Sequence, residues 1–308
     1  MLKRFEGNPV LAPIPDHSWE AYMVYNVAAI FEAGKVFILY RAQGTKSGPS
    51  RIGCAISRDG FHIDERLPNP IFEPRTDSDI ELFGCEDPRL SRIGDRIYMC
   101  YTAYGLMDRM DRETRTIQIG ITSISVDDFV NKRWNWGERI YPLPRVNNKD
   151  AALLPEKVDG KFILYHRIPP HIWIGFSDDL RTFYDMRIIM MPEAEWESFK
   201  IGAAGPPMRV DDGWLFIYHG VDRRLFYRLG AALLDLNDPT RVIRRSRTPI
   251  LEPINEYEKA GAVPNVTFSC GSIIIGDELL VYYGGADTVT GVASIKVRDL
   301  IDRLEKVA

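Results

Sequence analysis

The segment Lys35-Val36-Phe37-Ile38-Leu39-Tyr40 is a short apolar run that ends in tyrosine and follows the turn signal Ala33-Gly34. The same pattern recurs in four further segments, at residues 96–101, 161–165, 214–218 and 279–283. A turn signal containing glycine and another apolar run precede each copy, so each copy predicts a β-hairpin. Five hairpins about 55 to 65 residues apart indicate a repeat fold.

A third apolar segment with small residues near its start follows each hairpin, and four copies add a fourth segment that ends in proline. The third segments span residues 52–57, 118–123, 173–177, 229–234 and 291–295, and the fourth span 69–74, 139–142, 187–192 and 248–253. The fifth copy has no fourth segment. The same sequence pattern occurs at the other end of the chain, at Asn8-Pro9-Val10-Leu11-Ala12-Pro13. We therefore predict that an N-terminal strand completes the last blade.

Together these elements predict an all-β protein in which residues 1–308 form a single five-bladed β-propeller domain. The convincing helix pattern is the amphipathic segment 297–304, which predicts a short C-terminal helix. A content of 45% hydrophobic and 27% charged residues is ordinary for a globular protein and argues against a disordered or coiled-coil chain.

The formal net charge is −4 and the chain has no basic block, so its composition gives no support to a nucleic-acid or anionic-membrane partner. No apolar run approaches the roughly 18 residues that span a bilayer, and the first residues lack the apolar core of a signal peptide. We therefore expect a cytoplasmic protein whose partners are small molecules, and the sequence leaves a homo-oligomer open.

The four cysteines contain no C-x-x-C pair, and the five histidines contain no H-x-x-x-H spacing. Cys54 and Cys100 lie in apolar runs, where a reduced thiol packs as a small hydrophobic side chain. The sequence thus predicts neither a disulfide framework nor a metal site.

Polar residues occupy equivalent positions in the repeats, where strands of a propeller converge on the central channel. These positions carry Asn26, Glu86, Asp87, Lys149, Asp150 and Asn265 on the first strands, and Arg41, Thr102, His166, Arg167, His219 and Asp287 after the second strands. Because burying unpaired charge is costly, the set predicts a shared functional pocket. The alternative is a network of structural ion pairs that lines a water-filled channel.

The sharpest local motif is Gly84-Cys85-Glu86-Asp87-Pro88-Arg89. Pro88 predicts an extended backbone at Asp87, and a short carboxylate held rigidly at the channel mouth suits a general acid. The same residues also fit an Asp-Pro turn in which Arg89 forms an ion pair with Asp87 at the surface. The motif by itself leaves both interpretations open.

Several motifs follow one another in an order that resembles a known family. They are Tyr25-Asn26, Arg51-Ile52-Gly53, Ser57-Arg58-Asp59-Gly60, Glu86-Asp87-Pro88-Arg89, the stretch 149–157, His166-Arg167, Gly213-Trp214-Leu215, Tyr218-His219-Gly220 and Tyr283-Gly284-Gly285-Ala286-Asp287. In this order they resemble glycoside hydrolase family 130, the β-mannoside phosphorylases and mannosidases, which are five-bladed propellers. The resemblance covers nearly the whole chain.

The resemblance implies that Asp87 is the sole catalytic acid and protonates the glycosidic oxygen of a β-mannoside through a sugar hydroxyl. In the phosphorylases, inorganic phosphate attacks the anomeric carbon from the opposite face and gives α-mannose 1-phosphate with inversion. Phosphate is then a co-substrate, and neither a cofactor nor a metal is implied. An enzyme that uses this nucleophile needs cations to hold it and needs no carboxylate base to activate water.

The resemblance also implies the ligands of both substrates. The expected phosphate ligands are Lys149, Arg167, Arg209, His219 and Tyr227, and the expected mannoside ligands are Asn26, Arg41, Arg51, Glu86, Asp150, His219 and Asp287. Lys149 stands where some phosphorylases of the family carry arginine, so a paired contact would become a contact with a point charge.

Three other functions remain open from the sequence. An inverting mannosidase would need a second carboxylate roughly 6.5–9.5 Å from the acid, and the presence of Lys149 and Arg167 argues against it. A furanosidase-type glycosidase would need a carboxylate on the first inner strand, where this chain has Asn26. A sugar-binding propeller without activity would repeat one site in several blades, whereas these blades carry different polar residues.

Two further features are candidates for the outer part of the site. Trp134, Trp136 and Trp173 could stack on sugar faces, although tryptophan in a β protein more often packs in the core. The segment 106–115 is dense in charge and methionine, and we expect it to border the acceptor sugar or a subunit contact.

Overall fold

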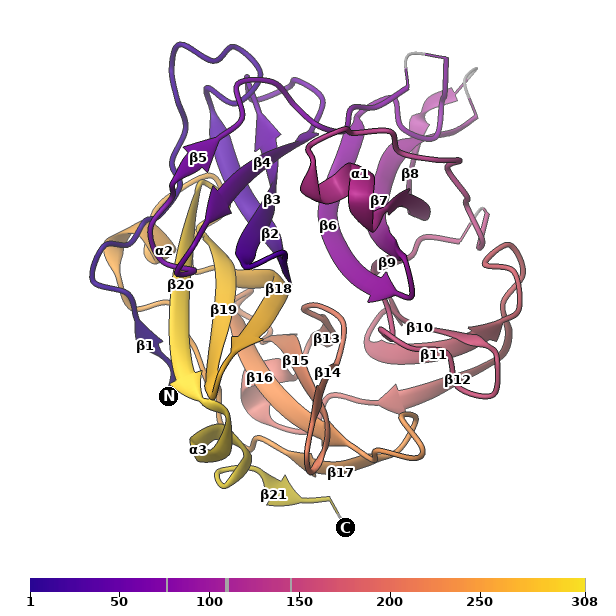
Figure 1. Ribbon diagram of the computed structural model, residues 1–308, viewed down its shortest axis with the longest axis vertical. Coiled ribbons are helices and arrows are strands. Elements are labelled where there is room, and N and C mark those ends of the chain that lie inside the picture. The colour runs from indigo at the N-terminus through magenta and orange to yellow at the C-terminus, as the bar shows by residue number, and fades with distance from the viewer. Residues whose placement is uncertain (76, 109–110, 145, 308) are drawn as a thin grey trace.

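The computed structural model describes residues 1–75, 77–108, 111–144 and 146–307. Within these residues the strands form five antiparallel sheets that surround a central axis as the blades of a propeller (Figure 1). The predicted five-bladed β-propeller is therefore confirmed. In every blade the strand nearest the axis comes early, and the chain then moves outward strand by strand.

Blades 1 and 2 form the N-terminal part of the ring. Blade 1 contains β2 (Met23–Glu32), β3 (Lys35–Gln43), β4 (Arg51–Ser57) and β5 (Glu65–Arg66). Blade 2 contains β6 (Gly84–Ile93), β7 (Arg96–Asp108) and β8 (Asp111–Ser125), followed by helix α1 (Val126–Val130). Part of the segment 106–115, at residues 109–110, lies outside the described residues.

Blades 3, 4 and 5 complete the ring. Blade 3 contains β9 (Lys149–Leu153), β10 (Phe162–Ile168), β11 (His171–Ser177) and β12 (Tyr184–Met190). Blade 4 follows the short helix at Glu195–Glu197 and contains β13 (Lys200–Ala203), β14 (Met208–Val210), β15 (Gly213–Val221), β16 (Tyr227–Leu234), β17 (Val242–Arg245) and β21 (Glu305–Lys306). Helix α2 (Glu256–Lys259) leads into blade 5, which contains β18 (Thr267–Ile275), β19 (Glu278–Gly285), β20 (Val289–Lys296) and β1 (Lys3–Arg4), and helix α3 (Val297–Ile301) follows β20.

The hydrophobic core lies between neighbouring blades, which explains why the second strands are apolar throughout. In β3, Phe37 and Leu39 pack in a cluster with blade 2, whereas Ile38 and Tyr40 pack in a cluster with blade 5. A strand that is buried on both faces has no polar face, so it reads as a continuous apolar run.

The tyrosine at the end of the second strand belongs to a buried hydrogen-bonded triad in four of the blades, as far as the chain is described. In blade 5, Tyr283 Oη donates to Glu258 Oε1 at 2.8 Å, and Arg4 Nε donates to the same oxygen at 2.7 Å. The corresponding glutamate, tyrosine and arginine are Glu20, Tyr40 and Arg66 in blade 1, Glu81, Tyr101 and Arg139 in blade 2, and Glu197, Tyr218 and Arg245 in blade 4. We call this arrangement the Glu–Tyr–Arg staple. It ties the segment before the inner strand to the second strand and to the outer edge of the blade.

The small residue of the third strand makes room for the tyrosine of the staple. A Cβ atom at Gly53, Gly120, Gly230 or Gly291 would lie 2.3–2.7 Å from a ring atom of that tyrosine. Blade 3 differs, because Tyr165 Oη donates to the main-chain oxygen of Pro239 at 2.8 Å.

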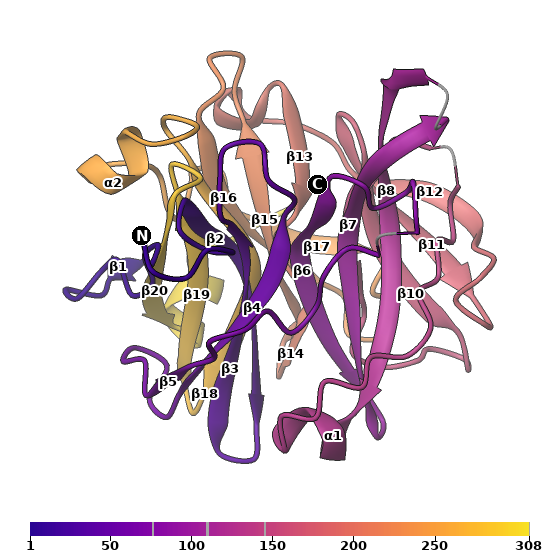
Figure 2. The same cartoon turned by 90° about the horizontal axis from the view of Figure 1, so that it is seen from above.

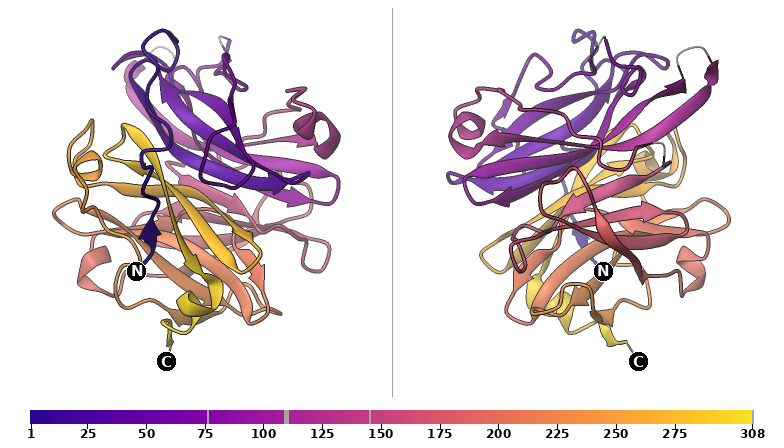
Figure 3. Two further views of the ribbon diagram at one scale, coloured as in Figure 1. Left: turned by 60° about the vertical axis from the view of Figure 1, so that its left-hand side comes forward. Right: turned by 90° about the vertical axis from the view of Figure 1, so that its right-hand side faces the viewer.

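The N-terminal closure is confirmed, but the closing strand is not the predicted one. Lys3–Arg4 pairs with β20, and the segment 8–13 contributes a single bridge from Leu11 to Thr290. Figure 3 shows the N-terminal strand, in indigo, beside the yellow strands of blade 5. The proline-ending segments of blades 1, 2 and 4 make the same kind of bridge, at Phe72, Ile140 and Leu251. Proline has no N–H to donate, so a ladder cannot extend through these segments.

The C-terminal prediction also needs a correction. Helix α3 ends at Ile301 rather than Leu304, and the chain continues into β21, which pairs with β17 at the outer edge of blade 4. Seen from the side, α2 and α1 lie toward opposite ends of the blades (Figure 2). We call the end where the inner strands begin, next to α2, the entry end.

The staple of blade 5 makes closure of the ring testable. Replacing Arg4 by Ala removes a charge partner of Glu258, whose side chain is fully buried. We expect the free energy of unfolding to fall by about 3 kcal/mol, the low end for a broken buried pair, because Tyr283 and the Ile254 N–H still donate to Glu258.

Urea denaturation measures this loss. Lys3→Ala, at the exposed neighbouring position, is the matched control and should change the free energy of unfolding by no more than about 0.5 kcal/mol. Equal stability of the two variants would contradict a role of the Arg4–Glu258 pair in closure.

Candidate active site

The inner strands of blades 1, 2 and 3 each place one residue in the left-handed backbone region at the entry end. The φ angles are 49° at Asn26, 50° at Asp87 and 57° at Asp150. Strand register shifts at each of these points, as in a β-bulge. Asn and Asp tolerate this conformation better than most residues, and a bulge redirects the side chain that it carries. The extended backbone predicted at Asp87 is therefore wrong, because the bulge overrides the preference imposed by Pro88.

Asp87 lies at the centre of the group that these bulges bring together. Its Oδ1 accepts from Asn26 Nδ2 at 2.8 Å and from Arg41 Nη1 at 3.2 Å, and its Oδ2 accepts from Lys149 Nζ at 2.8 Å. Burial alone would raise the pKa of Asp87, but the charges of Lys149, Arg41 and Arg89 outweigh burial and hold the pKa well below its usual range. Asp87 is therefore ionised in the ligand-free protein.

Glu86, next in the chain, is held on the side of blade 1. Its Oε1 accepts from Arg41 Nη2 at 2.6 Å and from Ser50 Oγ at 3.1 Å. Burial raises the pKa of Glu86, and Arg41 offsets only part of this effect. Arg41 thus bridges the two adjacent carboxylates.

Asp150 is placed differently from the sugar ligand that the resemblance implies. Its side chain is fully buried, with Oδ1 at 3.1 Å from Arg89 Nη2 and Oδ2 at 2.6 Å from Arg167 Nη1. Burial would raise the pKa of Asp150, but Arg167, Lys149 and other positive groups lower it overall. Both oxygens face cations, so the contacts support a counter-ion role beneath the cationic group.

His219 and Tyr227 flank these cations from blade 4. Arg167 Nη1 donates to His219 Nε2 at 3.1 Å, and burial lowers the pKa of His219 well below its usual value, so the imidazole is neutral. The rings of His219 and Tyr227 stack with their centroids 6.3 Å apart. Gly202 is required by this packing, because a Cβ there would lie 2.6 Å from Asp150 Oδ2 and from His219 Cε1.

Lys200 is a member of the cationic group that the sequence analysis did not identify. It begins β13, and its Nζ lies 5.4 Å from the ring centroid of Tyr227. Burial and the neighbouring Arg167 lower the pKa of Lys200 to about 8. Lys200 could have been found from its position at the start of an inner strand, which is equivalent to the position of Lys149.

Two predicted ligands lie outside this group. Arg209 is exposed at the opposite end of blade 4, where it pairs with Glu156 at 2.9 Å. Pro206 and Pro207 separate β13 from β14, so Arg209 belongs to the later part of the inner strand. Arg51, on the third strand of blade 1, donates to Glu73 at 2.8 Å. The structure therefore does not bring Arg209 or Arg51 to Asp87.

Asp287 approaches the site from blade 5. It is half-buried, with a φ of 51°, just after β19. Burial raises the pKa of Asp287 to about 6, and Arg41 opposes part of this shift. The candidate active site therefore consists of Asn26, Arg41, Glu86, Asp87, Lys149, Asp150, Arg167, Lys200, His219, Tyr227 and Asp287.

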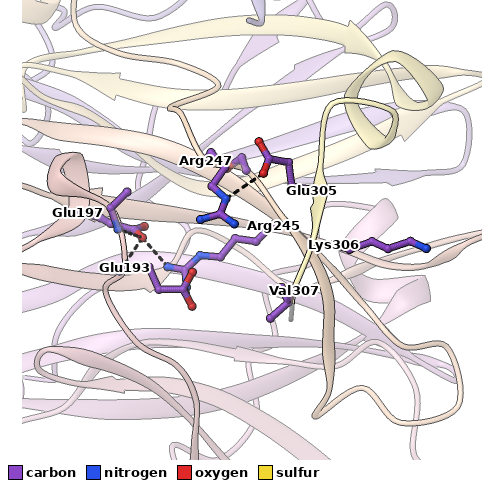
Figure 4. A pocket seen from close by; sticks show the side chains of 9 residues that line it. Glu193, Glu197, Arg245, Arg247, Glu305, Lys306 and Val307 are labelled. Carbon is purple, nitrogen blue, oxygen red and sulfur yellow. Dashed lines mark hydrogen bonds and ion pairs between the residues drawn. The ribbon is translucent and has the colours of Figure 1, made fainter.

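Other candidate features have structural roles. Trp134 and Trp136 pack against the core between blades 1 and 2, and Trp173 donates to the main-chain oxygen of Ile168. A cavity of about 350 Å³ at the outer edge of blade 4 is lined by the staple residues Glu197 and Arg245 and by β21 (Figure 4). It is thus a feature of the blade edge and not of the group around Asp87.

The cysteines and the possible metal-ligating side chains lie apart from one another in the described ranges. The four cysteines are free and buried. The described residues contain no group of three or more His, Cys, Asp or Glu side chains arranged to hold a metal ion. They also contain no helix that is long and apolar enough to cross a membrane.

A family model described as β-1,4-mannooligosaccharide phosphorylase matches residues 2–306. The chain belongs to glycoside hydrolase family 130. The resemblance inferred from the motifs is thereby confirmed. The chain is an enzyme, because its relatives are characterised glycoside phosphorylases. The alternative of a non-catalytic sugar-binding propeller is therefore not supported.

Two similar proteins come from Thermoanaerobacter sp. (strain X514). The 1,2-β-oligomannan phosphorylase is 44% identical over 308 residues, which cover 97% of this chain and 98% of that protein. The β-1,2-mannobiose phosphorylase is also 44% identical and covers 96% of this chain and 97% of that protein.

A solved structure of a family member has the same fold. The β-1,2-mannobiose phosphorylase from Listeria innocua, in complex with β-1,2-mannobiose, superposes with a TM-score of 0.82 at 29% identity. The match covers 98% of this chain and 99% of that chain. The enzyme is accordingly a phosphorylase of β-mannosides, which agrees with the function predicted from the sequence.

Proposed function

We propose that this family 130 enzyme cleaves β-1,2-linked mannosides with inorganic phosphate, that Asp87 is its general acid, and that Lys149, Arg167 and Lys200 hold the phosphate. The observation that carries the proposal is the contact between Lys149 Nζ and Asp87 Oδ2 at 2.8 Å, which places the acid beside the cationic group. The reaction breaks the glycosidic C–O bond, forms the C1–O bond to phosphate and transfers a proton to the leaving sugar.

The cationic group suits a phosphate dianion. Lys149 and Lys200 begin the inner strands of neighbouring blades, and Arg167 lies on the second strand beside Lys149 in the pairing register. Charge-assisted hydrogen bonds from such groups are about twice as strong as neutral ones. Asp150 and the neutral His219 hold Arg167 in place before phosphate arrives, so little reorganisation is needed when it binds.

Phosphate binding also supplies a reason for Asp87 to gain a proton. In the ligand-free protein Lys149 pairs with Asp87 and helps to keep it ionised. A dianion against Lys149 would take over part of that charge and add a negative charge near Asp87, and both effects raise the pKa of a carboxyl group. Asp87 would then be protonated when it is needed as an acid.

The carboxylates of Glu86 and Asp150 are held by other side chains and are not free to activate water. Glu86 is held by Arg41 and Ser50, and Asp150 is held between two arginines. With phosphate as the nucleophile, no general base and no cofactor are required. Asn26, Arg41 and Asp287 remain to bind hydroxyls of the reacting mannose, because planar amide, guanidinium and carboxylate groups make paired hydrogen bonds.

The proposed β-1,2 linkage is supported by the relatives with the higher identities. Those named for 1,2-β-oligomannan or β-1,2-mannobiose are 37–44% identical to this chain. A β-1,4-mannooligosaccharide phosphorylase from Ruminococcus albus is 30% identical.

The reaction is tested by incubating the enzyme with β-1,2-mannobiose or β-1,4-mannobiose, with and without inorganic phosphate. We expect α-mannose 1-phosphate from the β-1,2 isomer and only a trace of cleavage when phosphate is absent. Arg167→Ala should lower kcat/KM for phosphate by about 10- to 150-fold, the equivalent of a lost hydrogen bond to a charged group.

Arg209→Ala is the matched control, because Arg209 lies at the far end of blade 4, and its kinetics should equal those of the wild type. Free mannose released at the same rate with and without phosphate would identify a mannosidase instead. Preferential cleavage of the β-1,4 isomer would overturn the linkage alone.

The role of Asp87 is tested by Asp87→Asn, which keeps the shape of the side chain and cannot donate the proton. We expect kcat to fall by about 10²–10⁴, the usual contribution of a general acid, while the affinity for β-1,2-mannobiose measured by calorimetry changes little. Substantial turnover of a mannoside with a poor leaving group would remove Asp87 from this role.

The pKa of about 8 at Lys200 predicts a pH dependence of phosphate binding. Lys200 attracts phosphate only when it is protonated, so affinity should be full below pH 8 and decline as the pH rises above it. KM for phosphate should increase by up to about tenfold per pH unit there. Lys200→Arg stays charged throughout this range, so its KM should not show this rise. An identical profile in both proteins would exclude Lys200 as the titrating group.

A further inference from the structure

Arg89 is a buried arginine at the centre of the propeller. Its side chain is 1% exposed, although the sequence also fits a surface ion partner. Nη1 donates to the main-chain oxygen of Asp87 at 3.0 Å, and Nε donates to that of Ala204 at 3.1 Å. Nη2 donates at 3.1 Å to both Asp150 Oδ1 and the main-chain oxygen of Ala203.

These contacts join the inner strands of blades 2, 3 and 4. A fourth blade contributes Phe268, whose ring centroid lies 5.9 Å from Arg89 Cζ. The same ring lies 5.8 Å from Lys149 Nζ and 4.6 Å from the His219 ring. Arg89 and Lys149 therefore share the Phe268 ring, and Arg89 lies next to the acid and the counter-ion of the proposed phosphate cations.

The contact with the Asp87 carbonyl supports the bulge that aims the acid. Asp87 has a φ of 50°, and the strand pairing shifts register between Glu86 and Arg89. Pro88 has no N–H, so the strand ladder is interrupted at this point. A hydrogen bond from Arg89 to the Asp87 carbonyl satisfies an acceptor that would otherwise be buried without a partner.

The contact with Asp150 links the acid to the phosphate side. Arg89 holds one oxygen of Asp150, and Arg167 binds the other at 2.6 Å. A planar guanidinium can donate to the Asp87 and Ala204 carbonyls and to Asp150 in one fixed geometry, which an ammonium group cannot reproduce. Burying this charge favours stability only weakly, because apolar residues of similar size often serve a core as well.

We propose that Arg89 is a positioning residue of the phosphorolysis reaction, which fixes Asp87 relative to the phosphate cations through the Asp87 carbonyl and Asp150. The inference rests on the proposed function. Arg89 touches neither substrate in this scheme. Arg89 acts by keeping the carboxyl group of Asp87 and the proposed phosphate site at a fixed distance from each other.

The test compares wild type with Arg89→Lys and Arg89→Ala. Misplacing reacting groups by about 1 Å can cost 10²-fold in rate, so kcat should fall by about that factor in both variants. KM for phosphate should rise, because Asp150 is free to move with Arg167. The affinity for β-1,2-mannobiose in the absence of phosphate should change less than threefold. Added guanidinium should restore part of the activity of Arg89→Ala, a result that loss of folding would not produce.

Arg92→Ala is the matched control, since Arg92 lies on the same strand with a side chain that is 51% exposed and paired with Glu32. Its kcat and KM for phosphate should equal those of the wild type. If Arg89→Lys is folded and its kcat stays within threefold of wild type, the inference is wrong. If wild type itself forms no α-mannose 1-phosphate, the proposed function fails first.

Asp150→Asn keeps the inference testable should the Arg89 variants not fold, because it removes the charge between Arg89 and Arg167 without opening a cavity. The same rise in KM for phosphate, with little change in mannobiose affinity, is expected. An Asp150→Asn enzyme with unchanged phosphate kinetics would overturn the link from Arg89 to the phosphate cations.

Discussion

The Glu–Tyr–Arg staple is the buried polar interaction that four of the five blades share. In blade 5 the buried Glu258 accepts from Tyr283 of the second strand and from Arg4 at the outer edge. The glutamate is thereby satisfied by charge-assisted bonds, without which its burial would be unfavourable. In blades 1, 2 and 4 the staple glutamate lies three residues before the inner strand, so the staple holds the segment that enters that strand.

The starts of the inner strands matter because they carry several side chains of the candidate active site. Asn26 and Asp87 follow the staple glutamates Glu20 and Glu81 by six residues each, and both have a positive φ. The staple and the bulge together direct these side chains toward one another across two blades, as the 2.8 Å contact between them shows. Blade 3 has a different tyrosine contact, at Pro239, and it contributes Lys149 and Asp150 at the corresponding bulge.

The charges in the site suit the proposed binding of a phosphate dianion beside the carboxylate of Asp87. Asp87 and Asp150 are kept ionised by surrounding cations, while Asp287 and Lys200 are moved toward neutrality by burial. Such groups respond to a change in their surroundings, so a bound dianion would alter the proton affinity of the acid beside it. A preorganised group of this kind lowers the barrier because its dipoles and charges need not reorient during the reaction.

The sequence by itself determined the ring of five blades, because each second strand is buried on both faces and the third strand of four blades needs a glycine beside the staple tyrosine. It also predicted Asp87, Lys149 and Arg167 as site residues, since these polar residues stand at repeat positions that the packing does not require. Only the tertiary structure decided which end of a blade a residue occupies and what lies across the axis from it. Arg209 was expected in the site and lies at the opposite end, while the roles proposed for Lys200, Asp150 and Arg89 rest on neighbours in other blades. The spacing of residues along one strand sets neither the end of the blade that a side chain occupies nor its partners across the axis. The bulges redirect side chains, and the partners belong to distant parts of the chain.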